Sequence, residues 1–236
     1  MPRRMTESIE AQGEWLFRHR SGMGVVLLPC LAAALLWPGT PGNVFGDAMT
    51  DDVTVLGMVV SILGLVMRWF AYSRIRHPLY LANGVVVTGL CIATGSLWFT
   101  LLALALYALA VERIVAAEER FLADIYGQAY AQWASQTPAF VPDFSRWRRP
   151  NLPLSGRTIL RREYNGVLGV ALAFFVLEAA RDLLIEQQSW SAWIDDDGIW
   201  LWALGLGALS LVVLRTIKRR SRWLHPGRPT DADPPG

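Results

Sequence analysis

Six apolar runs constrain the fold of this 236-residue chain more than any other feature. They cover residues 23–37, 53–72, 79–93, 96–111, 166–184 and 199–217. A helix that spans a bilayer needs roughly 20 apolar residues, or somewhat fewer where the bilayer thins. Because 53% of the residues are hydrophobic and only 18% are charged, the sequence predicts an all-α fold. We expect a polytopic transmembrane bundle of about six helices, with 79–93 and 96–111 forming a short hairpin.

Basic residues lie on one side of these runs. Of the 22 lysines and arginines, all but Arg181 lie before the first run, from the last turn of the second run to the third, after the fourth, or from the end of the sixth onwards. The segments 38–52 and 185–198 carry none and hold acidic residues instead. Because Lys and Arg favour the cytoplasmic ends of membrane helices, we expect a multi-pass protein of the bacterial inner membrane with both termini cytoplasmic.

The predicted organisation has four parts. An amino-terminal cytoplasmic arm precedes a membrane core, two additional transmembrane helices follow, and a basic tail becomes disordered towards its end. Inside the core, the segment after the fourth run begins with a helix that reaches about Gln136, and four prolines in 137–155 predict an extended cover. The boundaries of the four parts are 1–22, 23–163, 164–217 and 218–236.

The first polar group lies between the second and third runs and contains Arg74, Arg76, His77 and Tyr80. Pro78 suits the first turn of a helix, which places His77 at the cap and Tyr80 on the same face. Such a helix start attracts carboxylates and phosphates. The alternative is that the arginines only anchor the membrane helices and that His77 is only a cap.

The second polar group follows the fourth run and contains Glu112, Arg113, Glu118 and Glu119. Acidic side chains close to the membrane on its positive side need partners or a ligand. The alternative is a solvated face on which Glu112 pairs with Arg113 and Glu119 with Arg120.

A third polar group lies on the fifth run and contains Glu178, Arg181 and Asp182. Glu178 and Arg181 are one helical turn apart, so they can form a structural pair; a contact with substrate is the alternative. No cluster of carboxylates and histidines indicates a metal site, and Cys30 and Cys91 have no paired spacing.

Three motifs in a fixed order carry a resemblance to a known family. The first is Arg76-His77-Pro78-Leu79-Tyr80, the second is the pair Glu118-Glu119, and the third is Tyr126-Gly127-x-x-Tyr130 with prolines behind it. Over 72–142 the chain resembles the isoprenylcysteine carboxyl methyltransferase and phospholipid methyltransferase superfamily. Its members are integral membrane enzymes that use S-adenosylmethionine, so the core 23–163 is expected to be methyltransferase-like.

The resemblance also implies a set of site residues. Contacts with S-adenosylmethionine are expected from Tyr72, His77, Pro78, Leu79, Tyr80 and Glu118. Arg76 and Arg113 are candidates for orienting an anionic acceptor. If the acceptor is an amine or a thiol, Glu119 or Glu112 is the expected base. Methyl transfer from a sulfonium requires alignment and exclusion of water, and no metal is expected.

The predicted function is therefore S-adenosylmethionine-dependent methylation of a lipid or another membrane-embedded amphiphile. The lipid bilayer and this acceptor are the expected partners, without nucleic acid or metal; the sequence identifies neither the acceptor nor the oligomeric state. The competing class is a non-catalytic membrane protein, either a transporter subunit or a lipid-binding scaffold. That class explains the arginines but leaves Glu118 and Glu119 unexplained.

Overall fold

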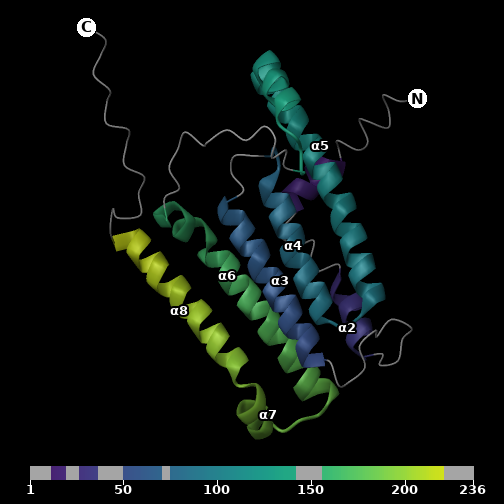
Figure 1. The fold of residues 1–236 in the computed structure, drawn as a ribbon, viewed down its shortest axis with the longest axis vertical. Coiled ribbons are helices and arrows are strands. Elements are labelled where there is room, and N and C mark those ends of the chain that lie inside the picture. The colour runs from purple at the N-terminus through teal and green to yellow at the C-terminus, as the bar shows by residue number, and fades with distance from the viewer. Residues whose placement is uncertain (1–11, 20–26, 37–49, 71–74, 142–155, 221–236) are drawn as a thin grey trace. The chain divides into compact units, whose positions relative to one another are not determined.

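The computed structural model describes residues 12–19, 27–36, 50–70, 75–141 and 156–220. These residues form helices and contain no β-strand, which agrees with the predicted all-α class (Figure 1). The chain divides into two compact units, Met1–Arg149 and Pro150–Gly236. Tyr72, Arg74, most of the predicted cover and the tail from 221 lie outside the described residues.

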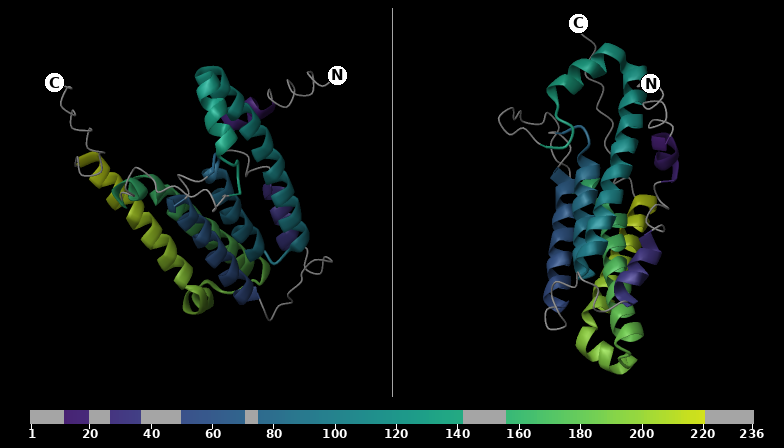
Figure 2. Two further views of the ribbon diagram at one scale, coloured as in Figure 1. Left: turned by 45° about the horizontal axis from the view of Figure 1, so that its top comes forward. Right: turned by 90° about the vertical axis from the view of Figure 1, so that its right-hand side faces the viewer.

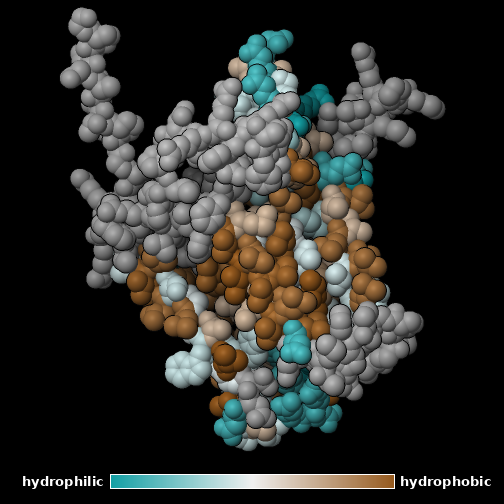
Figure 3. All heavy atoms as spheres, in the orientation of Figure 1, coloured by the Kyte–Doolittle hydropathy of each residue, from teal (hydrophilic) through white to brown (hydrophobic). Residues whose placement is uncertain are grey.

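Helices lie on all six predicted apolar runs, over their described residues. They are α2 (Leu28–Leu36), α3 (Thr50–Phe70), α4 (Pro78–Ala93), α5 (Leu97–Gln136), α6 (Gly156–Ala179) and α8 (Ile199–Arg220). Among the described residues, Leu97–Gln136 and Ile199–Thr216 are long and apolar enough to cross a membrane, and Pro78–Ala93 is a shorter apolar helix. On the face drawn in Figure 3, hydrophobic residues gather over the middle of the helices. The six-span arrangement stays a prediction.

In the first unit, α3 packs closely on α4 because small residues face each other. A Cβ atom on Gly57 would collide with the backbone carbonyl of Gly89, and one on Gly89 would collide with the carbonyl of Gly57. The Ser61 hydroxyl donates to the Val86 carbonyl at 3.0 Å. Small residues at such an interface let membrane helices approach backbone to backbone. The packing fixes the last turn of α3, which carries Arg68, against α4.

The predicted hairpin between α4 and α5 turns at Thr94 and Gly95. Gly95 has φ +67°, in the left-handed region that glycine adopts without a steric penalty. The Thr94 hydroxyl donates to the Cys91 carbonyl at 2.7 Å, which closes the end of α4. The helix that follows does not stop where the apolar run ends, since no proline or glycine interrupts it before Gly127. The apolar run and the polar helix predicted after it are therefore one element.

At Gly127 the direction of α5 changes. This residue has φ +50° and ψ −124°, a conformation outside the helical region, while the residues on both sides are helical. The last turns of α5 consequently bend away from the axis of the long segment (Figure 2). The chain then returns towards the start of α4, as its hydrogen bonds with Arg76 and His77 show.

The second unit contains α6 packed on α8, with a polar connection that the sequence did not predict in detail. A short π-helix, η5 (Ala180–Ile185), continues α6, and α7 (Trp190–Asp197) lies in the segment expected to be a loop. Ser189 caps α7 by accepting a hydrogen bond from the Ala192 N–H at 3.3 Å. Trp193, expected at a membrane interface, is fully buried in this unit.

Candidate functional site

The site begins at the amino-terminal end of α4. His77 is the N-cap residue and Pro78 occupies the first turn, as the sequence predicts, although the His77 side chain makes no capping hydrogen bond. The backbone N–H of Arg76 donates to the Pro138 carbonyl at 2.9 Å, and that of His77 donates to the Ala139 carbonyl at 3.1 Å. These two N–H groups are therefore used by the protein itself and are not available to an anion.

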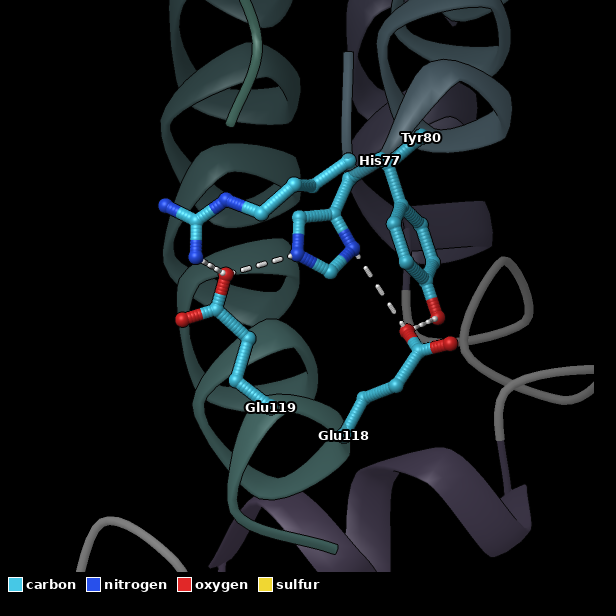
Figure 4. Close-up of polar contacts among 5 residues, drawn as sticks. His77, Tyr80, Glu118 and Glu119 are labelled. Carbon is cyan, nitrogen blue, oxygen red and sulfur yellow. Dashed lines mark hydrogen bonds and ion pairs between the residues drawn. The ribbon is translucent and has the colours of Figure 1, made fainter. Parts of the chain in front are cut away.

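Two consecutive glutamates on α5 face the His77 ring. His77 Nε2 lies 2.9 Å from Glu119 Oε1, and His77 Nδ1 lies 3.7 Å from Glu118 Oε2 (Figure 4). An ionised carboxylate only accepts hydrogen bonds, so Nε2 carries the hydrogen in the shorter contact. Arg76 Nη1 lies 2.6 Å from the same Glu119 oxygen. One carboxylate thus joins the two residues that precede α4 to the middle of α5.

Tyrosines connect the same two helices from the other side. The Tyr80 hydroxyl donates to Glu118 Oε2 at 3.2 Å, and the Tyr107 hydroxyl donates to the Tyr80 carbonyl at 2.6 Å. The Tyr80 and His77 rings are 6.0 Å apart between centroids, and the Phe140 ring is 5.8 Å from His77 on the returning segment. His77 is only 4% exposed because these rings and carboxylates surround it.

Burial distinguishes the two glutamates. The Glu119 side chain is 29% exposed and is held by Arg76 and His77. The Glu118 side chain is 36% exposed, and its hydrogen bond comes from Tyr80, a neutral donor. Glu118 therefore has the greater capacity to accept further hydrogen bonds from a ligand.

Tyr130 reaches this cluster because Gly127 bends α5. Over the part of the chain that the structure describes, its buried hydroxyl oxygen has no hydrogen-bond partner of good geometry, and the same holds for Arg76 Nε. Burial raises the pKa of the Tyr130 phenol, Arg76 opposes that change, and the charges of Glu119 and Glu118 add to it. The hydroxyl is therefore a hydrogen-bond donor at neutral pH. Two buried polar atoms without partners mark a place where a ligand could bind.

The structure brings together Arg76, His77, Tyr80, Glu118 and Glu119, whereas Arg113 lies elsewhere. Arg113 Nε donates to Gln12 Oε1 at 3.0 Å, and Nη1 lies 3.8 Å from the exposed Glu112. A Cβ atom on Gly13 would collide with the Arg113 carbonyl, so the helix over 12–19 packs tightly here. The solvated pair proposed for Glu112 and Arg113 is present, but Glu119 turns towards α4.

Some contributors to the site carry no signal in the sequence. Pro138 and Ala139 act through backbone carbonyls, which every residue has, so residue type could not reveal them. The tilted ring contact between Phe140 and His77 depends on the bend at Gly127. The glycine itself was the available clue in the sequence, since Gly127 interrupts an otherwise continuous helical pattern.

The third polar group forms a separate cluster in the second unit. Arg181 Nη1 donates to Glu178 Oε1 at 3.2 Å, which confirms that the two residues pair. The Trp193 indole N–H donates to Asp182 Oδ2 at 2.9 Å and ties η5 to α7. All four side chains are buried. Over the described residues, no group of three or more His, Cys, Asp or Glu side chains is arranged to hold a metal ion.

Comparison with known proteins bears on the site as well as on the fold. Residues 42–129 match the phospholipid methyltransferase family, and this range includes α4 and both glutamates. The chain is 32% identical over 155 residues to the cobalt-zinc-cadmium resistance protein CzcN of Cupriavidus metallidurans, covering 58% of this chain and 70% of the relative. It is 27% identical over 157 residues to the nickel-cobalt-cadmium resistance protein NccN of Alcaligenes xylosoxydans xylosoxydans, covering 57% and 70%. No solved structure matches.

The family match and the apolar helices assign the chain to a class of membrane proteins related to methyltransferases. The chain belongs to the phospholipid methyltransferase family, part of the isoprenylcysteine carboxyl methyltransferase-like superfamily. The resemblance carried by residues 76–80, 118–119 and 126–130 is therefore confirmed at the level of the family.

Proposed function

We propose that this protein is a multi-pass inner-membrane methyltransferase that moves a methyl group from S-adenosylmethionine to a lipid or another membrane-embedded amphiphile. Both termini are cytoplasmic in this proposal, and the amphiphile enters laterally from the bilayer. The four predicted parts, 1–22, 23–163, 164–217 and 218–236, keep their proposed roles, with the methyl-transfer site in the second. The observation that carries the proposal is the histidine held between two glutamates at the family motif.

The residues present fit S-adenosylmethionine. Tyr130 and Arg76 each present a buried polar atom that has no hydrogen-bond partner among the described residues, and both can donate hydrogen bonds to a carboxylate. Glu118 can accept hydrogen bonds from ribose hydroxyls or an amine, and the rings of His77, Tyr80 and Phe140 offer faces to a cation. The proposed contacts are Tyr72, His77, Pro78, Leu79, Tyr80 and Glu118, to which we add Tyr130.

The chain's task in such a reaction is alignment. When bound, the sulfonium supplies a methyl group that an acceptor atom takes by in-line displacement, leaving a neutral thioether. His77 and Arg76 fix Glu119, so the wall of the site on α5 stays in place while donor and acceptor meet. An anionic acceptor needs no base, and Arg76 and Arg113 are the predicted residues for orienting it. For an amine or a thiol, Glu119 or Glu112 is the proposed proton acceptor.

Binding of the cofactor tests the proposal directly. Purified full-length protein in a neutral detergent should bind S-adenosylmethionine in isothermal titration calorimetry. His77→Ala and Glu118→Gln should each weaken binding at least about tenfold, since a hydrogen bond to a charged group contributes about 1.5–3 kcal/mol. Glu14→Gln is the matched control because Glu14 is an exposed glutamate paired only with Arg18. Unchanged affinity in both site variants would overturn the assignment.

The names of the two relatives favour a second candidate. CzcN and NccN are called metal-resistance proteins, so this chain could contribute to tolerance of cobalt, zinc, cadmium or nickel without transferring methyl groups. Cells lacking the gene should be complemented with the wild type or with Glu118→Gln and then exposed to these metals. Equal tolerance with both would favour the non-catalytic candidate. If Glu118→Gln loses both metal tolerance and S-adenosylmethionine binding, metal tolerance depends on the methyltransferase site.

A further inference from the structure

A second place with buried polar atoms lies at the amino-terminal end of α5, in the turn that joins it to α4. It is the opposite end of these two helices from the site described above (Figure 1). From Ser96 to Glu118 a helix rises about 33 Å at 1.5 Å per residue. The polar groups of this turn are therefore too far from the His77 cluster to take part in it.

Most polar groups of the turn bind one another. The Thr94 hydroxyl donates to the Cys91 carbonyl and accepts a hydrogen bond from the Ser96 N–H at 3.3 Å. The Thr100 hydroxyl lies 3.1 Å from the Cys91 carbonyl and 2.8 Å from the Ser96 carbonyl. The two threonines thus satisfy the carbonyls of the turn, and the groups that stay without a partner are donors.

The first of these donors are two side chains at the start of α5. Ser96 is the N-cap residue, yet its side chain makes no capping hydrogen bond, whereas Ser189 caps α7. Only 1% of Ser96 is exposed, and its hydroxyl oxygen has no hydrogen-bond partner among the residues that the structure describes. Within the same described set, the Trp98 indole nitrogen is also buried without a partner. Burial of such groups without hydrogen bonds costs free energy, so both indicate an occupant.

The backbone of the same turn adds further donors. The first N–H groups of an α-helix, here those of Leu97, Trp98 and Phe99, have no partner within the helix. They form the positive end of the helix dipole, which attracts phosphates and carboxylates. Space is open beside Gly95, since a Cβ atom on it would meet nothing within 4 Å. Leu97 is exposed, so the turn reaches the surface of the first unit.

A phosphate group fits this set of donors best. A hydroxyl, an indole N–H and backbone N–H groups can all donate, so the ligand must offer several acceptor oxygens. Depth favours a phospholipid as its source. Helix α4 has 16 residues, about 24 Å at 1.5 Å per residue, whereas the hydrocarbon core of a bilayer is about 30 Å thick. A bilayer that thins around the short hairpin brings headgroups of the outer leaflet to the turn.

We propose that the amino-terminal end of α5 binds a phosphate group through the Ser96 hydroxyl, the Trp98 indole N–H and the backbone N–H groups of the first turn. The phosphodiester of an outer-leaflet phospholipid is the favoured source, and inorganic phosphate is the other source of the same chemistry. The site is separate from methyl transfer. A phospholipid bound there stabilises the hairpin of α4 and α5 and is not the methyl acceptor.

Thermal unfolding with simple probes tests the inference, since a ligand that binds the folded state raises Tm. Full-length protein in a neutral detergent is titrated with dihexanoyl phosphatidylglycerol, dihexanoyl phosphatidylethanolamine, dihexanoylglycerol or inorganic phosphate. Both phospholipids should raise Tm, and dihexanoylglycerol, which has the same chains without phosphate, should not. If inorganic phosphate acts at lower concentrations than the phospholipids, the occupant is the free anion; if it acts only at higher ones, the occupant is the lipid.

Two conservative variants remove one donor each. Ser96→Ala and Trp98→Phe should each need at least about tenfold more phospholipid for the same rise in Tm, because each loses a hydrogen bond to a charged group. Without ligand, Ser96→Ala should unfold at nearly the same Tm as the wild type, because its hydroxyl has no partner among the described residues. Ser135→Ala and Trp202→Phe are the matched controls, since both residues are exposed.

The remaining comparisons separate this site from the proposed methyl-transfer site. An unchanged phospholipid response in Ser96→Ala and Trp98→Phe would overturn the inference, as would an equal response to dihexanoylglycerol. Glu118→Gln should keep the full response, and its loss there would assign the phospholipid to the methyl-transfer site instead. Ser96→Ala should bind S-adenosylmethionine as the wild type does. If the wild type does not bind S-adenosylmethionine but its phospholipid response depends on Ser96, the proposed function fails while the phosphate site stands.

Discussion

His77 is almost fully buried, yet each of its ring nitrogens faces a carboxylate. Side chains at consecutive positions of a helix point in different directions. The buried imidazole faces both carboxylates and so fixes the distance between them. Arg76 adds a positive charge to Glu119 but not to Glu118. The two glutamates therefore differ in what their removal should do.

Glu119→Gln should reduce stability more than Glu118→Gln. The first change removes the negative charge that holds Arg76 and weakens the contact with His77, at a cost of about 1–3 kcal/mol. The second leaves an amide oxygen that can still accept from the Tyr80 hydroxyl, at a more exposed position. Thermal unfolding of the two variants in detergent measures the difference. A larger decrease in Tm for Glu118→Gln would contradict the roles given to the pair.

Tyr130→Phe should separate binding from stability. Among the described residues the hydroxyl oxygen has no hydrogen-bond partner of good geometry, with Arg76 its charged neighbour, so its removal should change Tm little. Affinity for S-adenosylmethionine should fall if this hydroxyl binds the cofactor. Tyr107→Phe is the comparison because it loses a 2.6 Å hydrogen bond to the Tyr80 carbonyl and should lower Tm. A Tyr130→Phe variant with a lower Tm and unchanged affinity would show that the hydroxyl stabilises the fold and does not bind the cofactor.

At the scale of single residues, the sequence identified the side chains that carry charge in the site. Spacing placed His77 and Tyr80 on one face of α4, and the exceptional position of Glu118 and Glu119 indicated that they need partners. The sequence offered only Arg120 as a partner for Glu119, and the contact with Arg76 could not be predicted because it depends on how α4 and α5 pack. The carbonyls of Pro138 and Ala139 were not predictable, since backbone groups have no sequence signal.

At the scale of elements, α5 combines an apolar part, a polar part and a bend at Gly127 in one continuous helix. Its apolar part packs against α4, and its polar part carries both glutamates and then bends at Gly127 to deliver Tyr130. Continuity between these parts holds the glutamates at a fixed distance from the hairpin, since a helix is stiff over this length. The bend supplies the change of direction that a straight helix could not make.

Gly127→Ala should therefore damage the site from a distance. At φ +50° and ψ −124°, any residue with a Cβ atom is strained, at a cost of about 1–3 kcal/mol. We expect a lower Tm and weaker S-adenosylmethionine binding, because Tyr130 and Phe140 would move relative to His77. Gly169→Ala is the control: this glycine lies inside α6, and a Cβ atom there meets nothing within 4 Å. Its Tm should stay equal or rise. Unchanged affinity of Gly127→Ala for S-adenosylmethionine would show that the bend is not needed for binding.

Element positions were predictable from apolar runs, and element lengths were less so. The hairpin of α4 and α5 follows from two short apolar runs and the glycine between them. The π-helical geometry of η5 at the end of the fifth run was not expected, and neither was α7, because 185–198 is acidic and has no apolar period. Their stabilisation comes from tertiary contacts, above all the hydrogen bond from Trp193 to Asp182, which a local pattern cannot reveal.

At the scale of the whole molecule, the distribution of charge predicts topology. Basic residues lie on one set of connecting segments, and the other set, 38–52 and 185–198, carries acidic residues and no basic ones. The site of the first unit uses residues from the basic side, so the topology and the proposed use of a cytoplasmic cofactor agree. The two units have separate internal packing, and each of them contains an ion pair, Arg76 with Glu119 in the first and Arg181 with Glu178 in the second.

Reporter fusions test this topology. An alkaline phosphatase fused after Ile194 should be active, since the segment between α6 and α8 is predicted to face the periplasm. The same enzyme fused after Val141 should be inactive, and a fluorescent protein at that position should fold, because this point is predicted to be cytoplasmic. The opposite pattern at either position would overturn the proposed orientation.

The hydrogen bonds from Arg76 and His77 to the carbonyls of Pro138 and Ala139 have a consequence for biosynthesis. They close a loop of about 60 residues, and such a closure costs entropy that local contacts within the loop must offset. A ribosome that has made only α4 and the apolar part of α5 has produced a hairpin but no binding site. The site forms after residue 140 leaves the ribosome, so a chain truncated just before that point should insert into the membrane and stay inactive.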